Sequence, residues 1–338
     1  MLGKQYLAKN TNSTYFWGQV SFLEFAIAYK KWPPMPVADR TLGQWVYWAA
    51  SVKDLSVKTI KTYVFGIRAM HLENGQVWTC WTQRFPVYQA LRSVKKIFGE
   101  ERRTLKLHIT LRILAGLVKW ANGWNSIDSA AKMFRCKENA ATFKAQCLVA
   151  FYGMLRKDNI AVAKADAFNP NRHLCRMDFG FEDQPGLRPA LPELLRIKIR
   201  HSKVIQFDNR CHEVLYVATG TALCPVNAVR ECLDLTLQDD EMGPAFVWKS
   251  GRKWQPATHR QFVRSVKAGV QHLGLDPAAY AGISFRRGGA TLAAEQGVDK
   301  ELIKELGDWK SDAYELYCRR PLSQRLILPT LFAKLARV

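Results

Sequence analysis

The stretch Ile283–Tyr317, "ISFRRGGATLAAEQGVDKELIKELGDWKSDAYELY", decides the fold of this chain. It begins with two adjacent arginines before a double glycine, and it ends on a tyrosine. Arginine suits a phosphate, because its planar and permanently charged group donates two parallel hydrogen bonds. Each glycine inside a helix costs roughly 1 kcal/mol of helix propensity, which indicates close approach by another backbone. The stretch therefore predicts a tightly packed helix that presents an arginine to a phosphate.

The overall composition indicates a globular protein with a polyanionic partner. The chain has 338 residues, 48% of them apolar, and a net charge of +21. Nucleic acid is the first partner to expect, although a ribosomal or membrane surface, or solubility alone, also fits such a charge. No apolar run is long enough to span a membrane, and the N-terminus lacks a signal-peptide core. We expect an intracellular protein located with DNA, in the nucleus if the source is eukaryotic.

The cysteines predict reduced thiols and no metal site. There are eight cysteines, and none forms a CxxC pair. The segments "HLC" (His173–Cys175) and "CH" (Cys211–His212) fit no closed four-ligand zinc pattern.

The first part of the chain, residues 1–98, predicts an all-helical domain. Apolar residues recur there at helical spacing, and Ser56 is suited to cap the third helix. The four predicted stripes are Phe16, Val20, Leu23 and Ile27; Leu42, Trp45, Val46 and Ala49; Ile60, Val64, Ile67 and His71; and, after Pro86, Leu91, Val94 and Phe98.

Residues 99–108, "GEERRTLKLH", predict a basic linker between two domains. The segment is polar and lacks periodicity, as a solvated linker would. Since it joins two parts of a basic protein, it is equally suited to follow a nucleic-acid backbone as part of a clamp.

Residues 109–338 predict a mixed domain. "ITLRILAGLVKWANG" and "ENAATFKAQCLVAFYGML" have helical patterns, while "LCRMDF", "LLRIKIRHSKVIQ" and "HEVLYVAT" predict strands. The expected fold class is mainly α with a small antiparallel β-sheet.

Four residue types in this domain together suit phosphodiester chemistry. A phenol aimed at a phosphodiester forms a phosphotyrosyl bond if cations hold the phosphate oxygens and an acid protonates the departing oxygen. The chain offers Arg156 after an apolar helix, Lys203 in the predicted hairpin, Arg286 in a helix and Tyr317 near its end.

The order of these residues and their surroundings resemble the tyrosine recombinases, the phage-integrase family. Arg156 in "YGMLRKDNI" matches the first arginine box, and Arg286 in "ISFRRGGAT" matches the second. "LGDW" matches the element before the nucleophile, and Tyr317 follows Asp308 by nine residues. The pattern is most similar to recombinases of eukaryotic mobile elements, the Crypton and DIRS-like groups, and it spans about residues 10 to 320.

The resemblance implies an all-α core-binding domain (1–98) and an α+β catalytic domain (109–338) that together clamp duplex DNA. It implies cleavage through a 3′-phosphotyrosyl bond, without ATP, an obligatory metal or another cofactor. Tyr317 is then the nucleophile, Arg156 and Arg286 hold the phosphate, and Lys203 is the general acid. Such proteins work as homo-oligomers, a dimer per site and a tetramer in synapsis.

The resemblance also assigns a C-terminal helix to residues 323–338. Its apolar stripe of Leu328, Leu331, Phe332 and Leu335 either docks on a neighbouring subunit or packs within its own domain.

The family pattern is broken where it matters most for proton transfer. The histidine of the second box is Ile283, which can neither donate nor accept a proton. Asp308 stands where histidine is commonest, and Trp309 is a second candidate for that position. The alternative is therefore a recombinase-derived DNA-binding protein whose catalysis is impaired. His201 or His259 is a possible substitute for the missing histidine, and Tyr314 is a rival nucleophile.

A set of basic residues on polar helix faces and in the linker is expected to contact DNA phosphates or groove edges. They are Lys58, Lys61, Arg68, Lys95, Lys96, Arg102, Arg103 and Arg287. An RNA-binding protein remains a further alternative, but it leaves the order of arginine, lysine, arginine and tyrosine unexplained.

Overall fold

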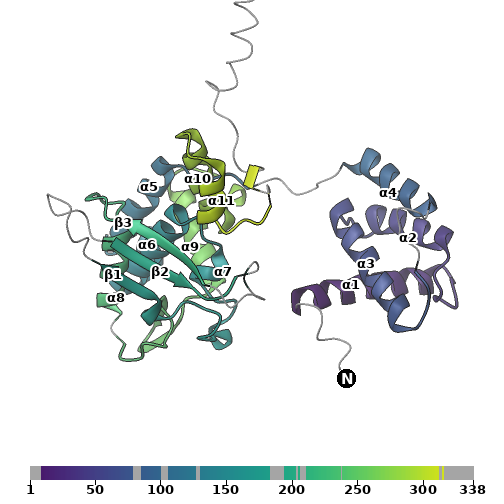
Figure 1. Ribbon diagram of the computed structural model, residues 1–338, viewed down its shortest axis with the longest axis horizontal. Coiled ribbons are helices and arrows are strands. Elements are labelled where there is room, and N and C mark those ends of the chain that lie inside the picture. The colour runs from purple at the N-terminus through teal and green to yellow at the C-terminus, as the bar shows by residue number, and fades with distance from the viewer. Residues whose placement is uncertain are drawn as a thin grey trace, which may run out of the picture. The chain divides into compact units, whose positions relative to one another are not determined.

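The computed structural model describes residues 9–78, 85–99, 106–126, 130–182, 194–202, 205, 211–236, 238–311 and 314–315 (Figure 1). The chain divides into two compact units, Met1–Thr104 and Leu105–Val338. Each unit has its own apolar core. Among the helices that the structure describes, none combines the length and apolarity needed to cross a membrane.

The N-terminal unit contains α1 (Lys9–Ala28), α2 (Asp39–Ser51), α3 (Val57–Glu73) and α4 (Phe85–Phe98). α1 packs against α3, and α2 packs against α4. The predicted stripes of α2 and α3 are confirmed, since all their members are buried. The Ser56 hydroxyl accepts a hydrogen bond from the backbone N–H of Thr59 at 3.2 Å and caps α3 as predicted. His71 is buried without cost because its Nε2 accepts from Val37 N at 3.0 Å.

The predicted stripe of α1 is wrong. Phe16 and Ile27 are 56% and 69% exposed, whereas Phe22 and Phe25 are buried. On α4, Phe98 is also exposed, while Leu91 and Val94 are buried as predicted.

Two glycines decide which face of α1 is buried. A Cβ on Gly18 would lie 2.8 Å from Cα of Tyr63, and a Cβ on Gly66 would lie 2.6 Å from the carbonyl oxygen of Tyr15. The backbones of α1 and α3 therefore touch at these positions, and this contact rotates α1 away from the face that its large apolar residues suggest.

The second unit is built around helix α6. Its helices are α5 (Leu111–Asn122), α6 (Lys137–Tyr152), α7 (Lys157–Ile160), α8 (Pro225–Leu235), α9 (His259–His272), α10 (Ile283–Glu295) and α11 (Lys300–Leu306), with short 3₁₀ turns at Ala130–Phe134, Ala165–Ala167, Arg176–Asp178 and Pro277–Ala279. Every residue of α6 from Asn139 to Phe151 is buried except Lys144. α5, α8 and α10 pack around it.

A three-stranded antiparallel sheet covers another side of α6 (Figure 1). The sheet has the order β1 (Phe179–Glu182), β2 (Leu194–Ile199) and β3 (His212–Val217). The Tyr216 hydroxyl in β3 donates to the carbonyl of Val149 in α6 at 3.1 Å. The predicted fold class, mainly α with a small antiparallel sheet, is confirmed.

The first predicted strand, residues 174–179, is wrong. Arg176–Asp178 forms a 3₁₀ turn, and β1 begins only at Phe179. The turn is fixed by the Asp178 carboxylate, which accepts from Cys175 N at 2.8 Å and from Arg200 Nε at 2.8 Å.

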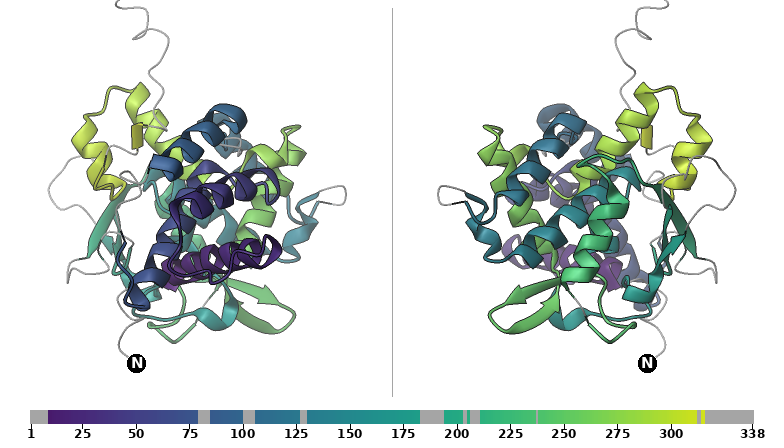
Figure 2. Two further views of the ribbon diagram at one scale, coloured as in Figure 1. Left: turned by 90° about the vertical axis from the view of Figure 1, so that its right-hand side faces the viewer. Right: turned by 90° about the vertical axis from the view of Figure 1, so that its left-hand side faces the viewer.

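The sequence interpretation missed a second, separate hairpin, β4 (Val247–Ser250) and β5 (Lys253–Pro256). Figure 2 shows it apart from the three-stranded sheet. Gly251 lies in its loop with a positive φ of 60°. A glycine in a two-residue loop between β-forming residues was the available signal.

The double glycine of α10 allows direct contact with α6. A Cβ on Gly289 would lie 2.1 Å from the carbonyl oxygen of Phe151, and a Cβ on Gly288 would lie 2.1 Å from that of Ile109. No side chain fits at either position. The predicted close approach of another backbone is confirmed.

Replacing Gly289 with alanine should lower the free energy of unfolding by about 1–3 kcal/mol, because the added carbon overlaps backbone that cannot turn aside. Gly116→Ala in α5 is the matched control, since its Cβ would meet only the side-chain end of Leu273. Urea denaturation followed by tryptophan fluorescence measures both. An equal loss in the two variants would contradict the close-contact argument.

Candidate active site

Arg156 lies between α6 and α7, with its backbone fixed by the short helix that follows. Its backbone N–H donates to Oδ1 of Asn159 at 3.0 Å. The buried amide of Gln146 donates to the carbonyl of Ile160 at 2.7 Å and ties α7 to α6. The guanidinium reaches Asp308 twice, from Nη1 to Oδ2 at 3.4 Å and from Nη2 to the carbonyl oxygen at 3.2 Å. Arg156 is held at two points, yet its side chain keeps 27% of its surface exposed.

Arg286 is the buried arginine of the site. It lies one turn into α10 and is only 3% exposed. Its Nη1 donates to the carbonyl of Met154, two residues before Arg156, at 2.5 Å. The guanidinium carbon lies 3.6 Å from the centre of the Trp309 ring, a cation–π contact that compensates part of its lost hydration.

Two consecutive residues after α11 therefore contact the two arginines. Asp308 has a left-handed backbone, with φ at 51°, which an aspartate tolerates better than most residues. The Trp309 ring folds back so closely on Gly307 that a Cβ there would lie 1.7 Å from it. The sequence left open whether Asp308 or Trp309 belongs to the site. In the structure each of them contacts one arginine, Asp308 with Arg156 and Trp309 with Arg286.

Ser202 and His212 join this arrangement, and the sequence interpretation missed both. The Ser202 hydroxyl donates to Oδ2 of Asp308 at 2.6 Å. Nε2 of His212, at the start of β3, donates to the carbonyl of Leu306 at 3.1 Å. These bonds join the sheet to the end of α11. Ser202 could have been suspected only from its place next to Lys203.

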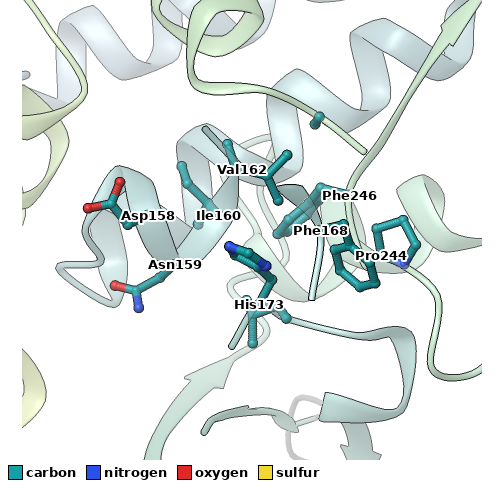
Figure 3. Close-up of a pocket in the computed structure, with 11 residues that line it drawn as sticks. Asp158, Asn159, Ile160, Val162, Phe168, His173, Pro244 and Phe246 are labelled. Atoms are coloured by element: carbon teal, nitrogen blue, oxygen red, sulfur yellow. The ribbon is translucent and has the colours of Figure 1, made fainter. Parts of the chain in front are cut away.

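Many of these residues line one small cavity. Its lining includes Arg156, Asn159, Ser202, His212, Arg286 and Asp308. A second small cavity lies on another side of α7, with Asp158 and Asn159 near one end of it (Figure 3). The remainder of that second lining is largely apolar and includes Phe168, Pro244 and Phe246. It suits packing, not phosphate binding.

Comparison with solved structures identifies the fold. No protein-family model matches the chain, and no curated protein matches it by sequence. The structure is similar to XerH site-specific recombinase bound to palindromic difH substrate, with a TM-score of 0.61 and 14% identity over 95% of this chain and 79% of that one. It is also similar to the Tn1549 transposon integrase in complex with transposon right end DNA, with a TM-score of 0.56 and 12% identity over 99% and 95%. The chain has the tyrosine-recombinase fold.

Two residues expected to act in the site, Lys203 and Tyr317, lie outside the described residues, as does the segment 323–338 with its apolar stripe. The rival nucleophile Tyr314 is described. It is 3% exposed and belongs to a small cluster with Met154 and Ala290. Its buried position leaves it poorly placed to meet a substrate.

Ile283 and the two histidines considered as its substitutes, His201 and His259, lie in different places in the unit. Ile283 is the first residue of α10 and is half-buried. Burial, and then the charge of Arg172, lower the pKa of His201. His259 lies beside Lys157, which follows Arg156.

Four of the eight basic residues expected on DNA are exposed on helix faces. Lys58 and Arg68 of α3 and Lys95 and Lys96 of α4 are exposed, whereas Lys61 of α3 and Arg287 of α10 are half-buried. Arg102 and Arg103 lie outside the described residues.

The structure adds a groove between α2 and α4 to this basic surface. Its lining includes Arg40, Tyr47, Tyr88, Arg92 and Lys96. Nη1 of Arg92 donates to the Tyr88 hydroxyl at 3.2 Å, which holds a charge beside an aromatic ring. Arg40 was not singled out from the sequence, because it is an isolated charge there.

Asp308→Asn should strengthen binding to duplex DNA, because it removes a negative charge that partly neutralises Arg156. The slope of log K against log salt should steepen by roughly 0.9, the change expected when one more phosphate is neutralised. Fluorescence anisotropy at several salt concentrations measures it. Asp299→Asn at the start of α11 is the control, since asparagine also caps helices there. If the two variants bind alike, the Asp308 carboxylate does not compete with phosphate.

Proposed function

We propose that this chain is a site-specific DNA recombinase or transposase that cleaves and rejoins duplex DNA through a 3′-phosphotyrosyl intermediate. The observation that carries the proposal is that Arg156, which precedes α7, and Arg286 of α10 line one small cavity. Two arginines brought together from distant segments of the sequence suit a single diester phosphate.

The proposed reaction conserves the number of phosphoester bonds. The Tyr317 hydroxyl attacks the phosphorus, the bond from tyrosine oxygen to phosphorus forms, and the bond to the 5′-oxygen breaks. Lys203 gives a proton to the departing 5′-oxygen, and a base takes the phenol proton. A second 5′-hydroxyl reverses the step on a new strand, so no ATP and no metal cofactor enters the balance.

The contacts of the arginines support their role as phosphate binders. Arg286 is fixed by the Met154 carbonyl and the Trp309 ring, so it needs little reorganisation when charge develops. Arg156 is more exposed and is paired with a carboxylate that a phosphate can replace. Together they form one rigid donor and one donor that changes its partner when DNA binds.

The charge of the chain supports DNA as the substrate. The net charge is +21, and exposed lysines and arginines follow α3 and α4. Both structural neighbours reported above were solved with DNA. We therefore propose that Lys58, Lys61, Arg68, Lys95, Lys96, Arg102, Arg103 and Arg287 hold the duplex, and that the chain acts as a homo-oligomer on its sites.

Tyr317→Phe should abolish the covalent adduct between protein and DNA. The cognate site, first selected from random DNA, is offered as a nicked substrate, and the adduct is detected on a denaturing gel. Tyr314→Phe is the control, since this buried residue lies three positions away, and it should still form the adduct. An adduct that persists in Tyr317→Phe, or none with the unmodified protein, would sink the proposal.

Alanine at a single phosphate-contacting residue, such as Lys95, should reduce the magnitude of the salt slope for DNA binding by about one unit. Binding isotherms at several salt concentrations measure the slope, and Lys253, an exposed residue of the β5 hairpin strand, is the matched control. If alanine at each of the proposed contacts leaves the salt slope unchanged, these residues do not bind DNA phosphates as a clamp. Competition between duplex DNA and RNA tests the RNA-binding alternative in the same assay.

The second candidate function is specific DNA binding without cleavage. Ile283 favours it, because removal of a general acid or base typically slows a reaction 10²–10⁴-fold. This candidate predicts tight binding to a selected site and no adduct even on the nicked substrate. We also propose, from the sequence pattern alone, that the chain is related to the recombinases of Crypton and DIRS-like elements.

A further inference from the structure

The groove between α2 and α4 belongs to the N-terminal unit alone. The two helices pack side by side (Figure 1), and a Cβ on Gly43 would lie 3.3 Å from the carbonyl oxygen of Pro86. Both of these residues line the groove, so the helices touch at its base. The groove has a volume of about 650 Å³, which is the size of many ligand-binding clefts.

Three aromatic side chains line this groove. Tyr47 comes from α2, and Phe85 and Tyr88 come from the first turn of α4. Their exposed fractions are 41%, 64% and 36%. Three large rings that stay accessible in one concave site indicate a ligand that covers them, because apolar surface gathered in this way is more often a binding site than chance.

The charge of the groove selects an anion. Arg40, Arg92 and Lys96 belong to its lining, and the described residues of the lining include no aspartate or glutamate. The guanidinium carbon of Arg92 lies 5.5 Å from the centre of the Tyr88 ring, and its Nη1 donates to the Tyr88 hydroxyl at 3.2 Å. A guanidinium held beside an aromatic ring offers phosphate donors and a flat surface for stacking at the same place.

Both walls of the groove combine aromatic and basic residues with amides. On α2, Arg40, Gln44 and Tyr47 share one face at spacings of four and three residues. On α4, Gln89 lies between the aromatic residues of the first turn and Arg92. The two glutamine side chains are exposed, and each carries both a donor and an acceptor for the edge of a base.

These features together suit an unpaired nucleic-acid strand better than a duplex. In a duplex the faces of the bases are covered by their neighbours, so a protein meets only base edges and the backbone. An unpaired strand offers base faces and phosphates together, and proteins that bind single strands combine a basic groove with stacking aromatic side chains. Packed helices have axes about 8–10 Å apart, whereas the major groove of a duplex alone is about 12 Å wide, so a single strand enters such a groove more readily.

We propose that the groove between α2 and α4 binds single-stranded DNA. Unpaired bases stack on Tyr47, Phe85 and Tyr88, and Arg40 and Arg92 bind the phosphates. This binding is separate from the proposed cleavage of duplex DNA and involves only residues of the N-terminal unit.

The first test compares two strands of equal charge. A labelled oligothymidylate of about 16 nucleotides is compared with an abasic deoxyribose-phosphate strand of the same length, in fluorescence anisotropy with the full chain. The oligothymidylate should bind about tenfold more tightly, because only this strand has bases to stack. The difference should persist at several salt concentrations, since both strands release the same counterions.

The second test removes the rings. Tyr47→Leu and Tyr88→Leu should each reduce the advantage of the oligothymidylate over the abasic strand about tenfold, whereas Tyr47→Phe should keep it, because a phenyl ring still stacks. Arg40→Ala should weaken the binding of both strands alike. Tyr29→Leu is the matched control, since Tyr29 is 53% exposed and contacts Phe25 at the end of α1. Circular dichroism of each variant establishes that the fold is intact.

Several results would overturn the single-strand site. Equal affinities of the unmodified protein for the two strands would exclude base stacking, and so would leucine variants that bind as the unmodified protein does. If the leucine variants lose as much affinity for a duplex of the same length, the groove is a duplex contact. If oligouridylate binds more than about tenfold more tightly than oligothymidylate, the groove is an RNA site. None of these results affects the adduct test of Tyr317→Phe, so the proposed function stands or fails separately.

Discussion

The contact between α10 and α6 is the constraint on which the site depends. Gly288 and Gly289 let the α10 backbone lie directly on the carbonyl groups of Ile109 and Phe151. At that distance the buried Arg286 reaches the Met154 carbonyl at the end of α6. A larger residue at either glycine would move the arginine away from the loop that carries Arg156. The helix propensity lost at two glycines is thus offset by a geometry that no other residue permits.

Charge compensation is the second physical theme. Two guanidinium groups near one cavity repel each other and lose hydration. Different partners compensate the charge of each one. Arg156 has a carboxylate and a carbonyl from Asp308, while Arg286 has a carbonyl and the face of Trp309. The Asp308 carboxylate is an unusual partner for a phosphate-binding arginine, because its negative charge repels a phosphate that approaches Arg156. In the proposed function, DNA binding includes the exchange of one anion for another at Arg156.

Ile283 bears on which of the two candidate functions applies to this chain. Taken from the sequence, isoleucine at this position removes a proton carrier and favours a protein that binds without cutting. In the folded chain, Lys157 runs past the residue before Ile283 and ends on His259. Lys157, Asp158 and His259 thus form a cluster of titratable groups close to the start of α10.

The sequence by itself determined the helices with regular apolar stripes, strands β2 and β3, the tight packing at the double glycine, and the two arginines of the candidate site. Each of these follows from a local rule of spacing or residue type. Only the tertiary structure decided the buried face of α1, because backbone contacts at Gly18 and Gly66 outweigh the positions of its large side chains. Only the tertiary structure placed Ser202, His212 and Asp308, since the hydrogen-bond partners of these residues are about 90–150 residues away along the chain. Such contacts arise from packing between distant elements, and no local pattern encodes them.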